Sequence, residues 1–128
     1  MKITAFNPLI VTKNAEATIA LFEALGFERR HTKTGIEGII STFNMRYTGE
    51  DGKEFNINIS EAPVEQDIPT IRMNVRDFDE AYQLLEARGF KNAQGDKVTD
   101  TGSSKATMMV SPSGFSINIS EHIRKEDE

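Results

Sequence analysis

The sequence contains one seven-residue segment twice, with a single change. FNINISE at residues 55–61 returns as FSINISE at residues 115–121, and LFEALGF at 21–27 is echoed by LLEARGF at 84–90. Because the order of the two segments is the same in both halves, each half carries the same elements. Two copies of so long a unit indicate a duplicated domain, since a solenoid needs three or more repeats to bury its core.

Each half is predicted to contain one helix. The two helices share an N-cap residue, apolar side chains at helical spacing and a glycine directly after the last turn. The helix over residues 14–25 has Asn14, Leu21, Phe22, Leu25 and Gly26 in these roles. The helix over 77–88 has Asp77 with Glu80 as a capping box, then Ala81, Leu84, Leu85 and Gly89.

Alternation of apolar and polar residues predicts the strands. In 55–61 and 115–121, Phe and Ile alternate with Asn and Ser, and residues 70–75 follow the same pattern. Since each helix needs an apolar partner, we expect the Phe and Ile face to pack on the helices and the Asn, Ser and Arg face to point away. The other predicted strands are 3–11, 28–33, 39–47, a short one near Lys91, and 106–110, with hairpin turns at 49–52 and 111–114.

These elements predict an α+β fold of two tandem βαβββ modules that form a curved mixed sheet, a half-barrel with the helices on its convex face. The whole chain, residues 1–128, is then one domain, with modules at 1–61 and 70–121 and a connector at 62–69 between two prolines. The polar segment 91–105 is either a lid over a site or an irregular strand edge.

Composition excludes several classes of function. The chain has no cysteine, which removes disulfides and thiolate metal sites, and we expect it to be cytoplasmic. A net charge of −5 argues against nucleic-acid binding and suits a cationic ligand. No apolar run approaches the length of a membrane span, and nucleotide-binding and serine-hydrolase motifs are missing. Residues from Ile123 onward are expected to form a solvated end.

The order strand, helix ending in LGF and three strands, repeated once, resembles the vicinal oxygen chelate superfamily, which includes glyoxalase I, extradiol dioxygenases and bleomycin-binding proteins. NAEATIALFEALGF, VRDFDEAYQLLEARGF and SPSGFSINI carry the resemblance. It covers residues 2 to about 121. It implies the fold but not one activity, because one fold serves many functions.

The resemblance also implies where a metal would be held. The superfamily's enzymes bind a divalent ion through His or Glu on the first and last strands of the modules. The matching positions here are Phe6, Asn58, Thr70 and Asn118. None of these is a good ligand for a catalytic divalent metal, so we expect neither a metal nor another cofactor. Shifting the register to make Glu54, Glu61 or Glu121 a ligand would turn the Ile face away from the helices, so these glutamates are expected to be surface charges.

The candidate ligand-binding residues lie on the predicted polar face. They are Phe6, Arg46, Asn56, Asn58, Thr70, Arg72, Asn74 and Asn118. Amides offer donors and acceptors without charge, and an arginine can bind a carboxylate or phosphate, which conflicts with a cationic ligand. Asn58, Arg72 and Asn118 are expected to line one concavity with Phe6 on its wall. His31, on the second strand, is more often structural at such a position.

The sequence therefore favours a metal-independent protein that binds a small organic molecule, sequestering it as bleomycin-binding proteins do. The alternative is a glyoxalase-like lyase or isomerase with an unconventional site, in which His31 or a carboxylate of the 91–105 segment transfers protons. A third possibility is an interaction module whose sheet is closed by a partner protein.

We expect a homodimer at micromolar concentration, because open strand edges are usually covered by a second copy and closed two-fold dimers are the commonest assembly. Sedimentation velocity across a concentration series measures this. A monomer at every accessible concentration would contradict the prediction.

Overall fold

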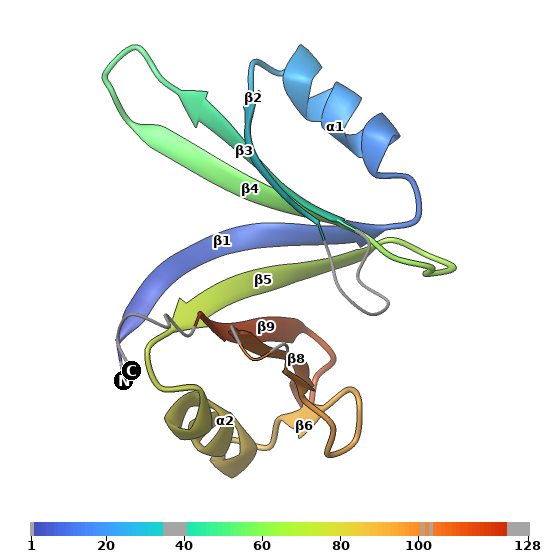
Figure 1. Ribbon diagram of the computed structural model, residues 1–128, viewed down its shortest axis with the longest axis vertical. Coiled ribbons are helices and arrows are strands. Elements are labelled where there is room, and N and C mark those ends of the chain that lie inside the picture. Colours follow the sequence, from blue (N-terminus) through green and yellow to red (C-terminus); the bar gives the residue numbers. More distant parts are fainter. Residues whose placement is uncertain (1, 35–40, 101, 103, 123–128) are drawn as a thin grey trace. The chain divides into compact units, whose positions relative to one another are not determined.

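The computed structural model describes residues 2–34, 41–100, 102 and 104–122 of the 128-residue chain. Its elements follow the predicted order twice (Figure 1). They are β1 (Ile3–Thr12), α1 (Ala15–Ala24), β2 (Glu28–Thr34), β3 (Ser41–Thr48), β4 (Glu54–Glu61), β5 (Ile68–Val75), α2 (Phe78–Ala87), β6 (Lys91–Asn92), β7 (Thr99–Asp100), β8 (Ser104–Val110) and β9 (Ser116–His122). The α+β class and the two βαβββ modules are confirmed.

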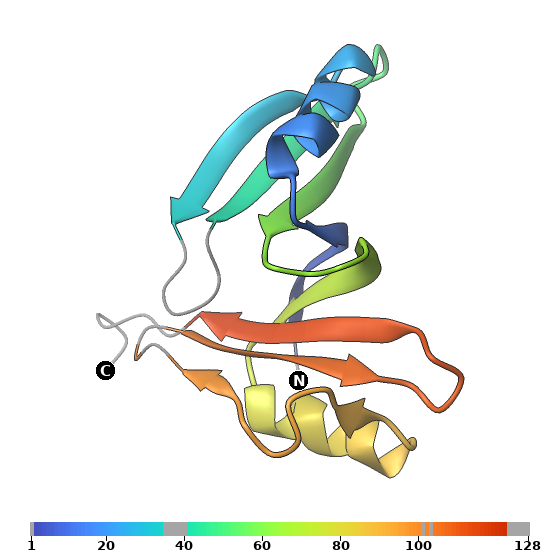
Figure 2. The ribbon, with the colours of Figure 1, turned by 90° about the vertical axis from the view of Figure 1, so that its right-hand side faces the viewer.

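The chain divides into two compact units. One comprises Asn7–Pro69, and the other comprises Met1–Phe6 together with Thr70–Glu128, so the first half of β1 groups with the second module. In the first unit the strands pair in the order β2-β3-β4-β1. In the second the order is β5-β9-β8-β6, with β7 also paired to β8 (Figure 2). Each module is mixed, because its first and last strands run parallel and its other pairs are antiparallel.

Each unit buries a core between its helix and one face of its strands. In the first unit Ala15 and Ile19 of α1 pack against Met45, Ile57 and Ile59. In the second unit three residues of α2 pack against β5, β8 and β9, with the cluster formed by Phe78, Ala81, Leu85, Met73, Val75, Met109 and Ile119. The predicted apolar face of the strands therefore does pack on the helices.

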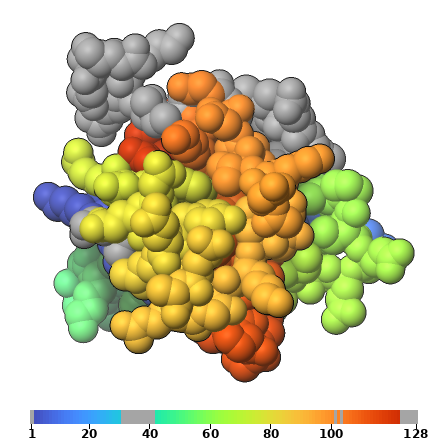
Figure 3. All heavy atoms as spheres, turned by 90° about the horizontal axis from the view of Figure 1, so that it is seen from below, coloured from blue at the N-terminus to red at the C-terminus, as the bar shows by residue number. Residues whose placement is uncertain are grey.

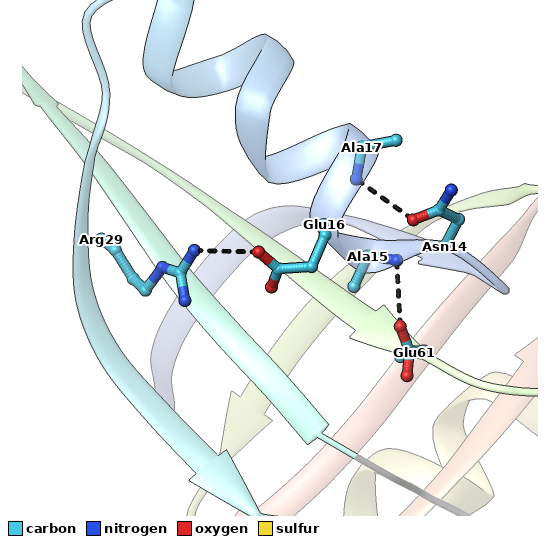
Figure 4. Close-up of polar contacts among 6 residues, drawn as sticks. All are labelled: Asn14, Ala15, Glu16, Ala17, Arg29 and Glu61. Carbon is cyan, nitrogen blue, oxygen red and sulfur yellow. Dashed lines mark hydrogen bonds and ion pairs between the residues drawn. The ribbon is translucent and has the colours of Figure 1, made fainter.

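A glutamate at the end of each closing strand binds the start of the module's helix. The Glu61 carboxylate accepts a hydrogen bond from the Ala15 amide at 3.1 Å (Figure 4), and Glu121 accepts one from the Phe78 amide at 3.0 Å. These amides would otherwise lack a partner in the helix, and the positive end of the helix dipole favours the carboxylate. The prediction that these two glutamates are surface charges was wrong, because they cap helices.

The predicted N-caps complete the same two helix starts. The Asn14 side chain accepts from the Ala17 amide at 3.2 Å, and Asp77 accepts from the Glu80 amide at 3.0 Å. Each helix therefore has two of its first amides satisfied by side chains.

Glycine ends both helices, as predicted. Gly26 and Gly89 have positive φ angles of 105° and 92°. The amides of Phe27 and Phe90 reach back to the carbonyls of Phe22 and Leu85 at 2.9 and 3.0 Å, which is the bond of a Schellman motif. A Cβ at Gly89 would also lie 2.8 Å from the Pro112 ring, so another residue is doubly disfavoured there.

Part of the predicted helical stripe was wrong. Leu21 and Leu25 are 56% and 58% exposed, and Leu84 is 46% exposed. Successive helical residues are rotated by about 100°, so Leu21 lies about 200° around the helix from the buried Ile19. The leucines at helical spacing therefore lie on the exposed side of α1. The buried side is formed by Ala15 and Ile19.

Phe55 and Phe115 were also expected to be buried, and each is 54% exposed. The ten residues of α1 cover about 15 Å, whereas the strand from Glu61 back to Phe55 spans about 20 Å. Because Glu61 holds the start of the helix, Phe55 extends past its end. Its ring contacts Tyr47 instead, with centroids 6.1 Å apart, and Phe115 contacts Phe90 at 5.5 Å.

The segment 91–105 is an irregular strand edge in its described residues. β6 and β7 both pair with β8, and Val98 packs against the core of α2. The Asn92 amide donates to the Tyr82 hydroxyl at 3.3 Å and to the Lys97 carbonyl at 2.8 Å. In Figure 3 this segment, in orange, lies directly beside α2, in yellow. These contacts favour the strand edge over the lid.

Most strand boundaries agree with the predicted ones to within two residues. Of the predicted strand 39–47, residues 39 and 40 lie outside the described residues, as does the predicted solvated end from Ile123. Among the described helices, neither is long and apolar enough to cross a membrane.

Replacing either capping glutamate by alanine should lower the free energy of unfolding by about 1–2 kcal/mol, because a helix amide then loses a charged acceptor. Glu61→Gln keeps an acceptor oxygen and should lose less. Urea unfolding measures the change, with Glu65→Ala as control because Glu65 is exposed in the same unit. Equal stability of Glu61→Ala, Glu121→Ala and Glu65→Ala would show that the caps contribute nothing.

Candidate functional site

The strand faces that point away from the helices carry the predicted polar residues. On β4, Ile57 and Ile59 pack on α1, so Asn58 between them points to the other face, where it is only 1% exposed. Leu9 of β1 and Asn44 of β3 lie opposite Asn58 on either side. The residues at alternate positions of β3 and β4 share this side, and together with Leu9 they are called the first polar face: Thr42, Asn44, Arg46, Asn56, Asn58 and Ser60.

Asn58 is hydrogen-bonded by Asn7, which is not among the predicted binding residues. The Asn7 amide donates to the Asn58 Oδ1 at 3.2 Å. Phe6, the neighbour proposed from the resemblance, is 59% exposed. Because successive side chains of a strand point to opposite faces, Asn7 and Phe6 cannot share a face where β1 is regular. The alternation Asn7, Leu9, Val11 was the signal that would have selected Asn7.

Arg46 and Asn56 are bonded to each other on the first polar face. The Arg46 Nε donates to the Asn56 Oδ1 at 3.1 Å, and its Nη1 lies 3.6 Å from a carboxylate oxygen of Glu54. The charge of this arginine therefore has a partner within the same hairpin. Thr42 and Ser60 likewise bond to each other at 2.9 Å.

Asn44 differs from these residues because its Oδ1 is buried without a hydrogen-bond partner, and it is the one such side-chain atom among the described residues. A buried acceptor without a donor costs about 1–3 kcal/mol. The first polar face therefore contains one acceptor whose bonding capacity is unused.

The second unit has an equivalent face, formed by β5, β8 and β9 and called the second polar face. Thr70 and Ser116 bond there, with the Ser116 hydroxyl donating to Thr70 at 2.7 Å and the Thr70 hydroxyl donating to the Ser116 carbonyl at 2.9 Å. Ser120 donates to the Asn74 Oδ1. Two of the predicted residues, Thr70 and Asn74, are thus occupied by neighbours on β9.

Arg72 and Asn118 form the cross-strand pair between these two bonded pairs. Burial lowers the pKa of the Arg72 guanidinium from its ordinary value, because the charged form loses solvation. Within the described part of the chain, neither side chain has a hydrogen bond or ion pair.

The structure describes the backbone of His31 but not its side chain. Its backbone pairs with Asn44 after a register shift between Arg29 and His31. The proposed proton-transfer role of His31 therefore stays a prediction.

The residues at the four expected metal positions do not fit a catalytic divalent ion. A phenyl ring offers no donor atom, the Thr70 hydroxyl and the Asn58 carbonyl are already bonded within the protein, and Asn118 offers a neutral amide. Glu61 and Glu121 lie on the helix face, where they bind amides. No group of three His, Cys, Asp or Glu side chains that could hold a metal occurs among the described residues.

Comparison by sequence finds no relative: no protein-family model matches the chain. No curated protein matches it either.

Comparison of structures finds close matches to the fold. The methylmalonyl-CoA epimerase of Streptomyces coelicolor, in complex with 2-nitronate-propionyl-CoA, has a TM-score of 0.64 at 17% identity, over 96% of this chain and 100% of the epimerase. The Mycobacterium tuberculosis epimerase has a TM-score of 0.64 at 16% identity, over 98% and 92%. A glyoxalase/bleomycin resistance protein/dioxygenase superfamily member from Vibrio splendidus 12B01 has a TM-score of 0.57 at 15% identity, over 94% and 99%. The chain has the vicinal oxygen chelate fold, as the resemblance implied.

Protein purified without chelator should carry no stoichiometric nickel, zinc, iron or manganese, because its amide and hydroxyl groups bind these ions too weakly. Its melting temperature should not change with EDTA. Elemental analysis by mass spectrometry and thermal unfolding measure both quantities. A tightly bound transition metal would overturn the assignment of Asn58 and Asn118 to the ligand positions.

Proposed function

We propose that the chain is a metal-independent protein that binds and sequesters a small organic molecule, because it has this fold and its residues at the four expected metal positions do not fit a catalytic divalent ion. Each polar strand face is a separate candidate site for such a ligand. The observation that carries the proposal is the unused bonding capacity there, above all the buried Asn44 Oδ1 without a donor. A hydroxyl or N–H group of a ligand would satisfy this acceptor.

The composition of the two faces supports a binding role. Asparagine is disfavoured in strands, yet it occurs at 44, 56, 58, 74 and 118. Charged exposed strands would serve solubility better, whereas amides provide directional donors and acceptors without charge. The structural matches support a small-molecule ligand, since one of those proteins was solved in complex with 2-nitronate-propionyl-CoA.

The proposal includes a cytoplasmic homodimer without a nucleic-acid partner. The absence of cysteine and the acidic net charge support the location and the exclusion of nucleic acid. Exposed Leu21, Leu25 and Phe55 support association, because large apolar side chains left on a surface can be covered by a second copy.

The first test identifies the ligand. Native mass spectrometry of the full chain as purified, followed by thermal-shift screening of a metabolite panel in EDTA, should reveal a small molecule that raises the melting temperature. A parallel assay on hemithioacetals should show no turnover. Turnover would favour the lyase or isomerase alternative, and the absence of any ligand would contradict the proposal.

Asn44→Ala separates binding from stability. Removing the unsatisfied acceptor relieves its desolvation cost, while truncating the side chain leaves a small cavity, so the free energy of unfolding should fall by no more than about 0.5 kcal/mol. A ligand identified at the first polar face should bind about tenfold more weakly. Asn58→Ala should instead destabilise by about 1–3 kcal/mol, since Asn58 is buried and bonded. Gln66→Ala, an exposed change in the same unit, is the control. Unchanged ligand affinity in Asn44→Ala would contradict the role of Asn44.

A further inference from the structure

We infer that a ligand of the second polar face carries an anionic group, a carboxylate or a phosphate, and that Arg72 and Asn118 bind it there. The inference rests on the proposed function and specifies the chemistry of the molecule. It also resolves the conflict between a cationic ligand, suggested by the net charge, and an anionic one, suggested by Arg72.

The hydrogen bonds of the second polar face leave one position open. The pair Thr70 and Ser116 is closed by two hydrogen bonds, and Asn74 is bonded by Ser120. Arg72 and Asn118 lie between these pairs. Because their neighbours on the same face are already bonded to each other, the guanidinium and the Asn118 amide have donors left for a ligand.

Arg72 needs a negative charge that the described residues do not provide. Of the arginines that the structure describes, Arg46 and Arg72 are the two that are half-buried, and the others are exposed to water. Arg46 has Glu54 beside it, whereas Arg72 has no ion pair within the described part of the chain. An arginine stays charged in proteins, so the lost solvation is a free-energy cost that a bound anion would offset.

The shape of the donors indicates which anions fit. A guanidinium presents parallel N–H groups that match the two oxygens of a carboxylate or phosphate, and the Asn118 amide adds a further N–H donor. Asn118 of β9 has Arg72 of β5 as its neighbour on one side and Met108 of β8 on the other, and Met108 is half-buried. An apolar side chain next to the anion site favours a ligand with an organic part over an inorganic ion.

The net charge of the chain does not exclude an anion. At physiological salt, exposed charges are screened over about 8 Å, so an acidic surface elsewhere has little effect at the site. A half-buried guanidinium is screened less and acts at hydrogen-bond distance.

The test is an NMR titration of the full-length isotope-labelled chain at constant ionic strength. The probes are sodium phosphate, acetate and butyrate, with choline chloride as the cationic comparison. Phosphate against acetate distinguishes the two anion sources, and butyrate against acetate measures the apolar contribution. The Arg72 side-chain N–H and Asn118 amide signals should shift saturably with at least one anion, and butyrate should bind more tightly than acetate.

Arg72→Gln should weaken the anion about tenfold or more, since one charged bidentate bond is lost. Arg76→Gln, an exposed arginine of the same unit just after β5, is the matched control and should bind like the wild type. If Arg72→Gln does not fold, Arg72→Lys replaces it, which keeps the charge and loses the fork. The wild-type titration is independent of either variant.

The inference is overturned if no anion shifts the Arg72 and Asn118 signals, if choline alone shifts them, or if a folded Arg72→Gln binds anions like the wild type. A co-purified neutral ligand that leaves the Arg72 signal unchanged would refute the inference while leaving the proposed function intact. Phosphate binding at Arg72 with no organic ligand from the panel would support the anion site and refute the proposed function.

Discussion

A single carboxylate in each unit joins the closing strand to the first turn of the helix. Glu61 binds the Ala15 amide, and Glu121 binds the Phe78 amide. Because side chains alternate along a strand, the same contact that turns Glu61 to the helix also turns Ile59 and Ile57 there. The polar faces follow from this constraint, since Asn58 and Asn118 must then point the other way. A shift of β4 by one residue in register would break the Glu61 cap and would also bury the asparagine side chains against the helix.

The polar faces differ in how their charges are compensated. On the first, Arg46 has Asn56 and Glu54 as partners from across the hairpin, so the guanidinium is part of the scaffold. On the second, Arg72 faces the neutral Asn118. Two half-buried strand arginines thus differ in whether a carboxylate lies within reach of the guanidinium. This contrast is why we place the proposed anion site on the second polar face and not on the first.

The repeat and the alternation were enough to predict the modules, both helices and the strand faces, because these depend on local periodicity. Contacts between distant residues were not predictable in the same way. Glu61 meets Ala15 across 46 positions, and no local pattern marks it as a cap. Leu21 and Leu25 were wrongly predicted to be buried, because helical spacing identifies residues that share a helix face but not whether that face packs on the sheet. Asn7 was not predicted because the resemblance placed Phe6 at the ligand position. The alternation of Asn7, Leu9 and Val11 along β1 indicates Asn7 instead.

For the candidate site, the sequence selected Arg72, Asn58 and Asn118 but could not rank them. The ranking needed the hydrogen-bond partners: Asn58 is bonded by Asn7, whereas Arg72 and Asn118 are unpaired within the described residues. Each unit also has its own hydrophobic cluster and its own helix cap. A substitution on one polar face therefore leaves the core and cap of the other unit untouched. Substitutions can therefore alter the polar groups of one half of the duplicated scaffold without changing the hydrophobic cluster or the helix cap of the other half.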